Sequence, residues 1–120
     1  MRRRCGKIRH DKVVMDGITF DSRAEGERYI VLRALQQQGL IRELTVHPRF
    51  ELIPSLRGPD GKVLFRAAHY TADFSYRKVP DGELTVEDVK SDYTRKEKET
   101  ILRRKMMYFV HHIYVEEVVM

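Results

Sequence analysis

The sequence has only one cysteine, Cys5, and no long apolar run. A single cysteine excludes an internal disulfide, and Cys5 lacks the paired spacing of a structural zinc site. No uninterrupted apolar stretch approaches the roughly 20 residues that a membrane helix needs. The basic N-terminal residues are not followed by the apolar core of a signal peptide. We therefore expect a cytoplasmic protein without a membrane partner, whose fold depends on its hydrophobic core.

Acidic residues are absent from positions 1–10, which hold five basic residues. These are Arg2, Arg3, Arg4, Lys7 and Arg9. The whole chain has 23 basic and 18 acidic residues, so this segment accounts for the entire net charge of +5. Basic arms commonly neutralise nucleic-acid phosphates, with an affinity that depends on salt. We predict a DNA-binding arm at residues 1–10, and the alternative is a tail that only aids solubility.

The length of 120 residues suits one domain, and we expect a single domain over residues 1–120. A hydrophobic fraction of 42% with 34% charged residues is typical of a globular protein and excludes a disordered one. The sequence shows no internal repeat.

A small hairpin and a helix are the first elements that the sequence predicts. Asp16-Gly17 supplies the positive φ values of a tight turn between two short strands within residues 12–20. Ser22 and Glu25 match a capping box, which predicts a helix that ends just before Gly39. Glu25 heads a stripe along this helix that is otherwise apolar.

Extended segments fill the middle of the chain. We predict one strand over 40–53, a loop over 54–62 and a long strand over 63–78. In the long strand, Asp73 lies on the more polar face, and the other face carries Tyr70, Ala72, Phe74 and Tyr76. The turn formers at 79–83 lead into a strand that contains Glu87-Asp88-Val89-Lys90.

An antiparallel hairpin would bring Asp73 beside this second strand. Paired residues in such a hairpin have a constant sum of residue numbers, which the turn determines. A turn centred on residues 80–81 gives a sum of 161 and opposes Asp73 to Asp88, whereas one centred on 81–82 gives 163 and opposes Asp73 to Lys90. Either register places Asp73, Asp88 and Lys90 on one face, within roughly 5–8 Å of one another.

A second helix and a final strand complete the predicted elements. Thr94 to Glu97 matches a further capping box, which predicts a helix to about Val110, followed by a strand over 112–119. The expected buried residues of this helix are Leu102, Met106, Phe109 and Val110. The basic residues expected to contact DNA here are Arg95, Lys96, Lys98 and Lys105. Lys98 and Lys105 alternatively only lie along the apolar stripe.

Asp73, Asp88 and Lys90 form a set of groups suited to phosphodiester hydrolysis. Two carboxylates offer the oxygen ligands that Mg²⁺ prefers, with room for several waters. A lysine beside them can orient the attacking water or stabilise the developing charge. Glu87 should point to the opposite face because strand side chains alternate. The alternative is a structural ion pair between Lys90 and either aspartate, which needs the same proximity.

Tyr70-Thr71-Ala72-Asp73-Phe74, followed by Glu87-Asp88-Val89-Lys90, resembles the metal-dependent PD-(D/E)xK nuclease superfamily. The resemblance is closest to a small phage-associated branch related to Holliday-junction resolvases, and it covers most of residues 16–118. It includes Phe20 to Glu25 at a helix start and Gly39-Leu40-Ile41 after that helix. Position 72 is Ala and not Pro, a departure that is common in the superfamily. The resemblance implies an α/β fold with a restriction-endonuclease-like αβββαβ core, in which helices flank a mixed sheet; here the hairpin and the basic arm precede it.

The resemblance also implies an activity and a role for each residue. Asp73 and Asp88 would bind the metal, Lys90 would be the catalytic lysine, and Glu25 would complete or orient the metal site. Glu25 alternatively only caps its helix. The implied enzyme is a DNA endonuclease, selective for branched DNA such as Holliday junctions, that uses Mg²⁺ or a substituting Mn²⁺ and no small-molecule cofactor.

Two further expectations concern partners and histidines. A small nuclease that must cut two strands is expected to act as a homodimer. The alternative function is a catalytically inactive nucleic-acid-binding module of the same fold. The five histidines are scattered, and we expect surface or packing roles for His10, His47, His69, His111 and His112.

Overall fold

The computed structural model describes residues 12–90 and 98–120. Its first elements are β1 (Val13–Met15), β2 (Ile18–Phe20) and α1 (Arg23–Gln37). The two strands form the predicted hairpin around Asp16-Gly17. The Ser22 hydroxyl caps α1 by accepting a hydrogen bond from the Glu25 N–H at 3.2 Å. The helix ends before Gly39, whose φ of +80° favours glycine, so both ends agree with the prediction.

Four strands form the central sheet. They are β3 (Ile41–Val46), β8 (Phe74–Lys78), β9 (Leu84–Lys90) and β10 (Val115–Val119). The order across the sheet is β10-β9-β8-β3; β8 is antiparallel to β3 and β9, and β10 is parallel to β9. The sheet is therefore mixed, and with its helices it gives the α/β fold that the sequence predicts.

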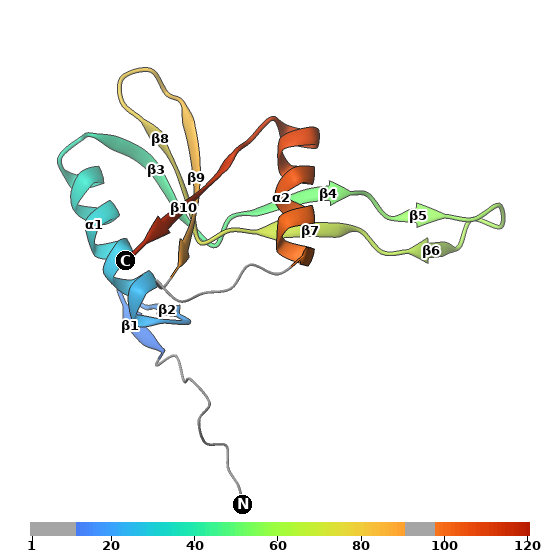
Figure 1. The fold of residues 1–120 in the computed structure, drawn as a ribbon, viewed down its shortest axis with the longest axis horizontal. Coiled ribbons are helices and arrows are strands. Elements are labelled where there is room, and N and C mark those ends of the chain that lie inside the picture. The colour runs from blue at the N-terminus through green and yellow to red at the C-terminus, as the bar shows by residue number, and fades with distance from the viewer. Residues whose placement is uncertain (1–11, 91–97) are drawn as a thin grey trace, which may run out of the picture.

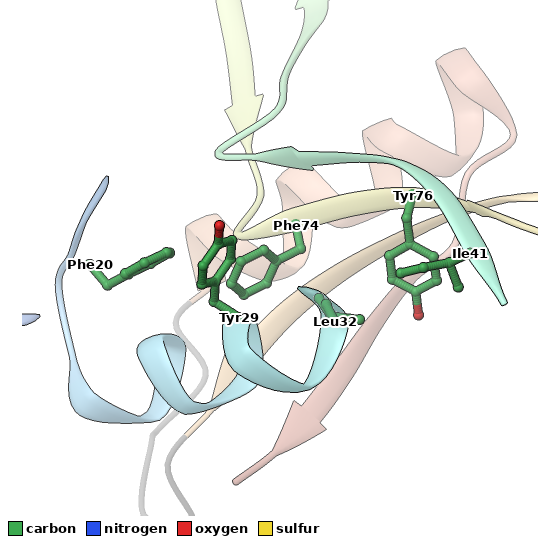
Figure 2. Close-up of a cluster of buried hydrophobic side chains, with 6 residues drawn as sticks. All are labelled: Phe20, Tyr29, Leu32, Ile41, Phe74 and Tyr76. Carbon is green, nitrogen blue, oxygen red and sulfur yellow. The ribbon is translucent and has the colours of Figure 1, made fainter. Parts of the chain in front are cut away.

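The two helices pack on opposite faces of this sheet. On β9, Val86 shares a core cluster with Met107 of α2 (Lys98–His111), whereas the next residue, Glu87, bonds Arg28 of α1. Adjacent strand residues point to opposite faces, so each helix covers one face. The α1 side contains the buried cluster of Figure 2, which comprises Phe20, Tyr29, Leu32, Ile41, Phe74 and Tyr76.

A long two-stranded arm extends away from the sheet (Figure 1). It consists of β4 (Arg49–Ile53) paired with β7 (Ala68–Thr71), and β5 (Leu56–Arg57) paired with β6 (Val63–Phe65). The predictions of one strand over 40–53 and one strand over 63–78 are therefore wrong. The predicted loop over 54–62 is confirmed except at Leu56–Arg57, which form β5. The chain turns at His47, which has a φ of +56° and separates β3 from β4. A second break in the extended chain, where it returns from the arm to the sheet, falls between β7 and β8.

This second break changes which side chains share a face. Tyr70 and Ala72 pack in the core cluster beside α2, whereas Phe74 and Tyr76 pack in the cluster beside α1. The prediction that all four occupy one face is wrong, because alternation by two holds only within an uninterrupted strand. Asp73 lies in the break itself.

Helix α2 buries a different side from the predicted one. Met107 is fully buried in the core cluster beside α2, and Met106 is partly buried against the same cluster. Leu102 and Phe109, expected to be buried, are 57% and 83% exposed, and Val110 is also exposed. Apolar residues occur around most of this helix, so their periodicity does not identify the packed side. Across residues 12–90 and 98–120, no helix is both long and apolar enough to span a membrane.

Some predictions fall outside the described residues. These are the basic arm at residues 1–10 with Arg2, Arg3, Arg4, Lys7 and Arg9, together with His10, the capping box at Thr94–Glu97, Arg95 and Lys96.

Candidate functional site

Asp73 lies where the chain passes from the arm into β8. The ladder between β8 and β9 pairs Phe74 with Glu87, a sum of 161, so the preceding position is opposite Asp88, in the first of the two predicted registers. The Asp73 N–H donates to Glu87 O at 3.1 Å and to Asp88 Oδ1 at 3.2 Å. Asp73 Oδ2 accepts from the Val89 N–H at 2.7 Å. Both the main chain and the side chain of Asp73 are thus fixed against β9.

The Asp88 carboxylate is held from the α2 side of the sheet. Its Oδ2 accepts hydrogen bonds from the Tyr70 hydroxyl and from the Arg104 guanidinium, the latter at 2.8 Å. Arg104 also pairs with Glu117 of β10, and its side chain is only 13% exposed. These contacts leave Asp88 with a defined orientation beside Asp73.

Asp73, Asp88 and Lys90 line one cavity of about 440 Å³. The other residues that line it are His69, Tyr70, Thr71, Val89, Thr100 and Arg103, from β7, β9 and α2. The structure therefore brings together the three residues that the hairpin register grouped, at the base of the arm. Their chemical roles stay predictions.

Glu25 extends from the first turn of α1 toward Asp73. Potential ligand atoms of Glu25, His47 and Asp73 all lie within 4.8 Å of one another. Glu25 Oε1 is buried and has no hydrogen-bond partner within the described part of the chain. His47 Nε2 lies 3.7 Å from it, beyond hydrogen-bond distance. A buried oxygen without a partner costs about 1–3 kcal/mol, and a bound cation would remove that cost.

Electrostatics at Asp73 also favour a cation. Burial raises the pKa of Asp73 to about 7, and the negative charges of Glu25 and Asp88 act in the same direction. The Val89 N–H and Lys90 only partly oppose this rise. Burial likewise raises the pKa of Glu25 above its usual value. A positive ion between such carboxylates would stabilise their ionised forms.

His47 joins this group, which the sequence did not indicate. It occupies the turn between β3 and β4, and its backbone N–H donates to the Asp73 backbone carbonyl oxygen at 2.9 Å. This bond places the histidine ring beside Asp73 and Glu25. The one local signal in the sequence is Pro48, which fits an edge strand as well as a turn.

Glu87 points away from the cavity, as predicted. It is 1% exposed, and Arg28 of α1 binds both of its carboxylate oxygens, at 2.9 and 2.6 Å. The Tyr76 hydroxyl donates to the same carboxylate. The two adjacent acids of β9 thus have different functions, because Glu87 joins α1 to the sheet and Asp88 lines the cavity.

Comparison with known proteins gives one match. Residues 5–118 match the model of a family described as Protein of unknown function (DUF1064). The chain belongs to this family. No curated protein and no solved structure matches it. All residues of the cavity and of the Glu25 group lie inside the DUF1064 range.

The donor set of this DUF1064 chain fits a divalent cation. Glu25 and Asp73 present carboxylate oxygens to the same space, and Glu25 Oε1 accepts no hydrogen bond from the described residues. Asp88 Oδ1 accepts the 3.2 Å bond from the Asp73 N–H and keeps a second lone pair. Carboxylates with open positions for water are what Mg²⁺ requires.

Helix α2 contributes cations to this region of the DUF1064 chain. Lys98 and Lys105, the described members of the predicted DNA-contact set on α2, are exposed. Arg103 lines the cavity and bonds Glu99 and the His69 carbonyl oxygen. The helix therefore carries positive charge both at the cavity and on its free surface.

Proposed function

We propose that this chain is a metal-dependent endonuclease that hydrolyses phosphodiester bonds in DNA. The observation that carries the proposal is the convergence of Asp73, Asp88 and Lys90 on one cavity, with Glu25 reaching Asp73 from α1. A purely structural ion pair of Lys90 leaves two features unexplained: Glu25 Oε1 accepts no hydrogen bond from the described residues, and the pKa of Asp73 is raised. Neither feature stabilises the fold, so both are better understood as properties of a binding site.

The order of the elements supports a restriction-endonuclease-like core. Without the hairpin and the arm, the chain runs α1, β3, β8, β9, α2, β10, which is the αβββαβ order that the motif resemblance implies. Asp88 and Lys90 lie at the end of β9, on the segment that precedes α2. The arm β4–β7 is an insertion between the first two strands of this core.

The carboxylates and the lysine of the site have different proposed roles in hydrolysis. We assign Glu25, Asp73 and Asp88 to holding Mg²⁺, with Mn²⁺ able to replace it. When bound, the cation supplies a Lewis acid that lowers the pKa of water and neutralises phosphate charge. Lys90, on the same face of β9 as Asp88, orients the attacking water or stabilises the charge on the phosphate.

Branched DNA and a homodimer are the proposed substrate and assembly. Two-fold symmetry would present one site to each of two strands. Large apolar side chains of the arm and of α2 are exposed and offer area for such an interface. The most exposed are Leu64 at 62%, Phe65 at 65% and Phe109 at 83%.

Cleavage of a labelled four-way junction, compared with a linear duplex, tests the proposed activity. We expect wild-type chain to cut the junction with Mg²⁺ or Mn²⁺ and not with a chelator. Asp73→Asn should abolish cutting because it removes a charged ligand while keeping an acceptor for the Val89 N–H. Asp81→Asn is the matched control, since Asp81 is exposed in the turn at the far end of β9.

An inactive nucleic-acid-binding module of the same fold is the second candidate. The exposed Lys98 and Lys105 support it, because they suit phosphate contacts whether or not the site is active. Binding of both DNA forms without cutting, under every divalent metal tested, would favour this module and refute the nuclease.

A further inference from the structure

His47 is the nitrogen-bearing member of the group around Asp73. The imidazole Nε2 lies 3.7 Å from Glu25 Oε1, and one ligand atom of each of His47, Glu25 and Asp73 lies within 4.8 Å of the others. This spacing is close to that of ligands around one ion. At this separation a protonated His47 forms an ion pair with Glu25, but the distance is too long for a hydrogen bond, so the imidazole nitrogen stays available to a metal ion when the ring is neutral.

The backbone and the core both hold the ring in this place. His47 has a φ of +56°, and its N–H bond to Asp73 O ties the turn to the site. The Phe20 ring, fully buried, lies behind the imidazole with a centroid separation of 6.1 Å. The His47 side chain is still 38% exposed, so one side of the ring region stays open to water or a substrate.

The unsatisfied oxygen of Glu25 supplies the second observation. Glu25 Oε1 is fully buried, and no group in the described ranges donates a hydrogen bond to it. The Glu25 side chain is 13% exposed, and its buried oxygen belongs to the same group as His47 and Asp73. An ion shared with the two neighbouring donors would satisfy an oxygen in this position.

The chemistry of the donors then decides which ion suits the group. Mg²⁺ prefers an all-oxygen shell, whereas imidazole nitrogen suits first-row transition metals. We propose that His47 is a metal ligand together with Glu25 and Asp73, and that this site prefers a transition-metal divalent ion such as Mn²⁺ or Co²⁺ to Mg²⁺. The inference rests on the metal centre of the proposed nuclease and adds a ligand and a metal preference to it.

Calorimetric titration with Mn²⁺ and with Mg²⁺ tests the preference, and Co²⁺ absorption spectra test the nitrogen ligand. We expect wild-type chain to bind Mn²⁺ at least about tenfold more tightly than Mg²⁺. His47→Asn should weaken Mn²⁺ binding by about tenfold or more and change the Co²⁺ spectrum, with a smaller effect on Mg²⁺. Asparagine tolerates positive φ, so this variant removes the imidazole without a new backbone conflict.

His112→Asn is the matched control. His112 also has a positive φ, of +58°, but it follows α2, and its ring contacts the Tyr108 ring. The His112→Asn variant should bind Mn²⁺ and Mg²⁺ with the same affinities as wild type. If His47→Asn binds both metals as wild type does, the inference is overturned.

A measurement on the unmodified chain covers the case in which a variant does not fold. In nitrogen-detected NMR spectra, one equivalent of the diamagnetic ion Zn²⁺, which imidazole also binds, should shift the coordinated ring nitrogen of His47 and leave the ring signals of His112 unchanged. An unshifted His47 nitrogen in the metal-bound chain would overturn the inference. A chain that binds Mn²⁺ through His47 but cuts no DNA would refute only the nuclease. A chain that cuts DNA while His47→Asn binds metal normally would refute only the ligand.

Discussion

Asp73 and Asp88 are adjacent in space, but their carboxylates lie in different electrostatic environments. Asp88 is neutralised by Arg104, whereas Asp73 has a pKa raised to about 7 by burial and by neighbouring carboxylates. The ionised Asp73 therefore destabilises the metal-free fold. Asp88, in contrast, has a guanidinium partner that would be left without it on substitution. This contrast at the level of single residues gives two predictions.

Asparagine substitutions should have opposite effects on metal-free stability. At about pH 8, Asp73→Asn should raise the free energy of unfolding, by on the order of 2–4 kcal/mol at most, because a buried charge is removed. Asp88→Asn should lower it by about 1–3 kcal/mol, since Arg104 loses a charged partner. Urea unfolding in a chelator measures both. If Asp73→Asn and Asp88→Asn destabilise the fold equally, the buried charge of Asp73 does not destabilise the metal-free protein.

The stabilisation by metal should depend on pH. The folded-state pKa of Asp73 is raised from 3.8 to about 7, so between these values the folded state binds more protons than the unfolded one. Metal-free stability should therefore fall as pH rises through this window. Mn²⁺ or Mg²⁺ should consequently raise the melting temperature more at about pH 8 than at about pH 5. Thermal scans at both pH values give the comparison, and a larger shift at the lower pH would contradict the assignment.

At the scale of elements, a buried ion pair joins α1 to the sheet. Arg28 binds both oxygens of Glu87, whose side chain is 2% exposed. This contact positions α1, and therefore Glu25, relative to β9 and the cavity. Its loss should affect both stability and the site.

Removal of the Arg28 side chain should be costly because Glu87 would stay buried without its partner. We expect Arg28→Ala to lower the free energy of unfolding by about 3–5 kcal/mol. Arg33→Ala is the control on the same helix, since Arg33 pairs with Asp16 at the surface, and it should cost much less than Arg28→Ala. Urea unfolding of both variants is the measurement. A similar small loss for the two would mean that the pair does not hold α1 in place.

Elements with strong local signals were predictable from the sequence. Asp16-Gly17 fixes the first hairpin, Ser22 caps α1, and the turn at 79–83 sets the register that opposes Asp73 to Asp88. The arm and the packed side of α2 were not predictable, because they depend on tertiary contacts. The segments 40–53 and 63–78 have β propensity throughout; Pro48 fits an edge strand as well as a turn, and no local signal marks the break at Asp73.

In the candidate site, too, local rules predicted some residues, and others depend on tertiary contacts. Asp73, Asp88 and Lys90 could be grouped from strand alternation and one turn, since these are local rules. His47 could not be grouped with them, because it reaches the site only through the change of direction between β3 and β4. Arg104 was also missed as the partner of Asp88, since helix periodicity does not say which cation faces a given strand.

At the scale of the whole molecule, the basic N-terminal residues should govern the salt dependence of DNA binding. Deletion of residues 1–10 removes the whole net charge of +5. The slope of log affinity against log salt should fall by about 0.9 for each phosphate contact that is lost. Fluorescence anisotropy over a range of salt concentrations measures the slope. An unchanged slope would mean that these residues make no phosphate contacts.

The central claim is that the cavity at the base of the arm hydrolyses DNA through Asp73, Asp88 and Lys90. Single-turnover cleavage of a four-way junction by wild type and Lys90→Ala tests it most directly, with Lys78→Ala as the control at the opposite end of β8. The account predicts metal-dependent cutting by wild type and Lys78→Ala, and a loss of about 100-fold or more in Lys90→Ala with DNA binding retained. Cutting by Lys90→Ala at the wild-type rate would contradict it.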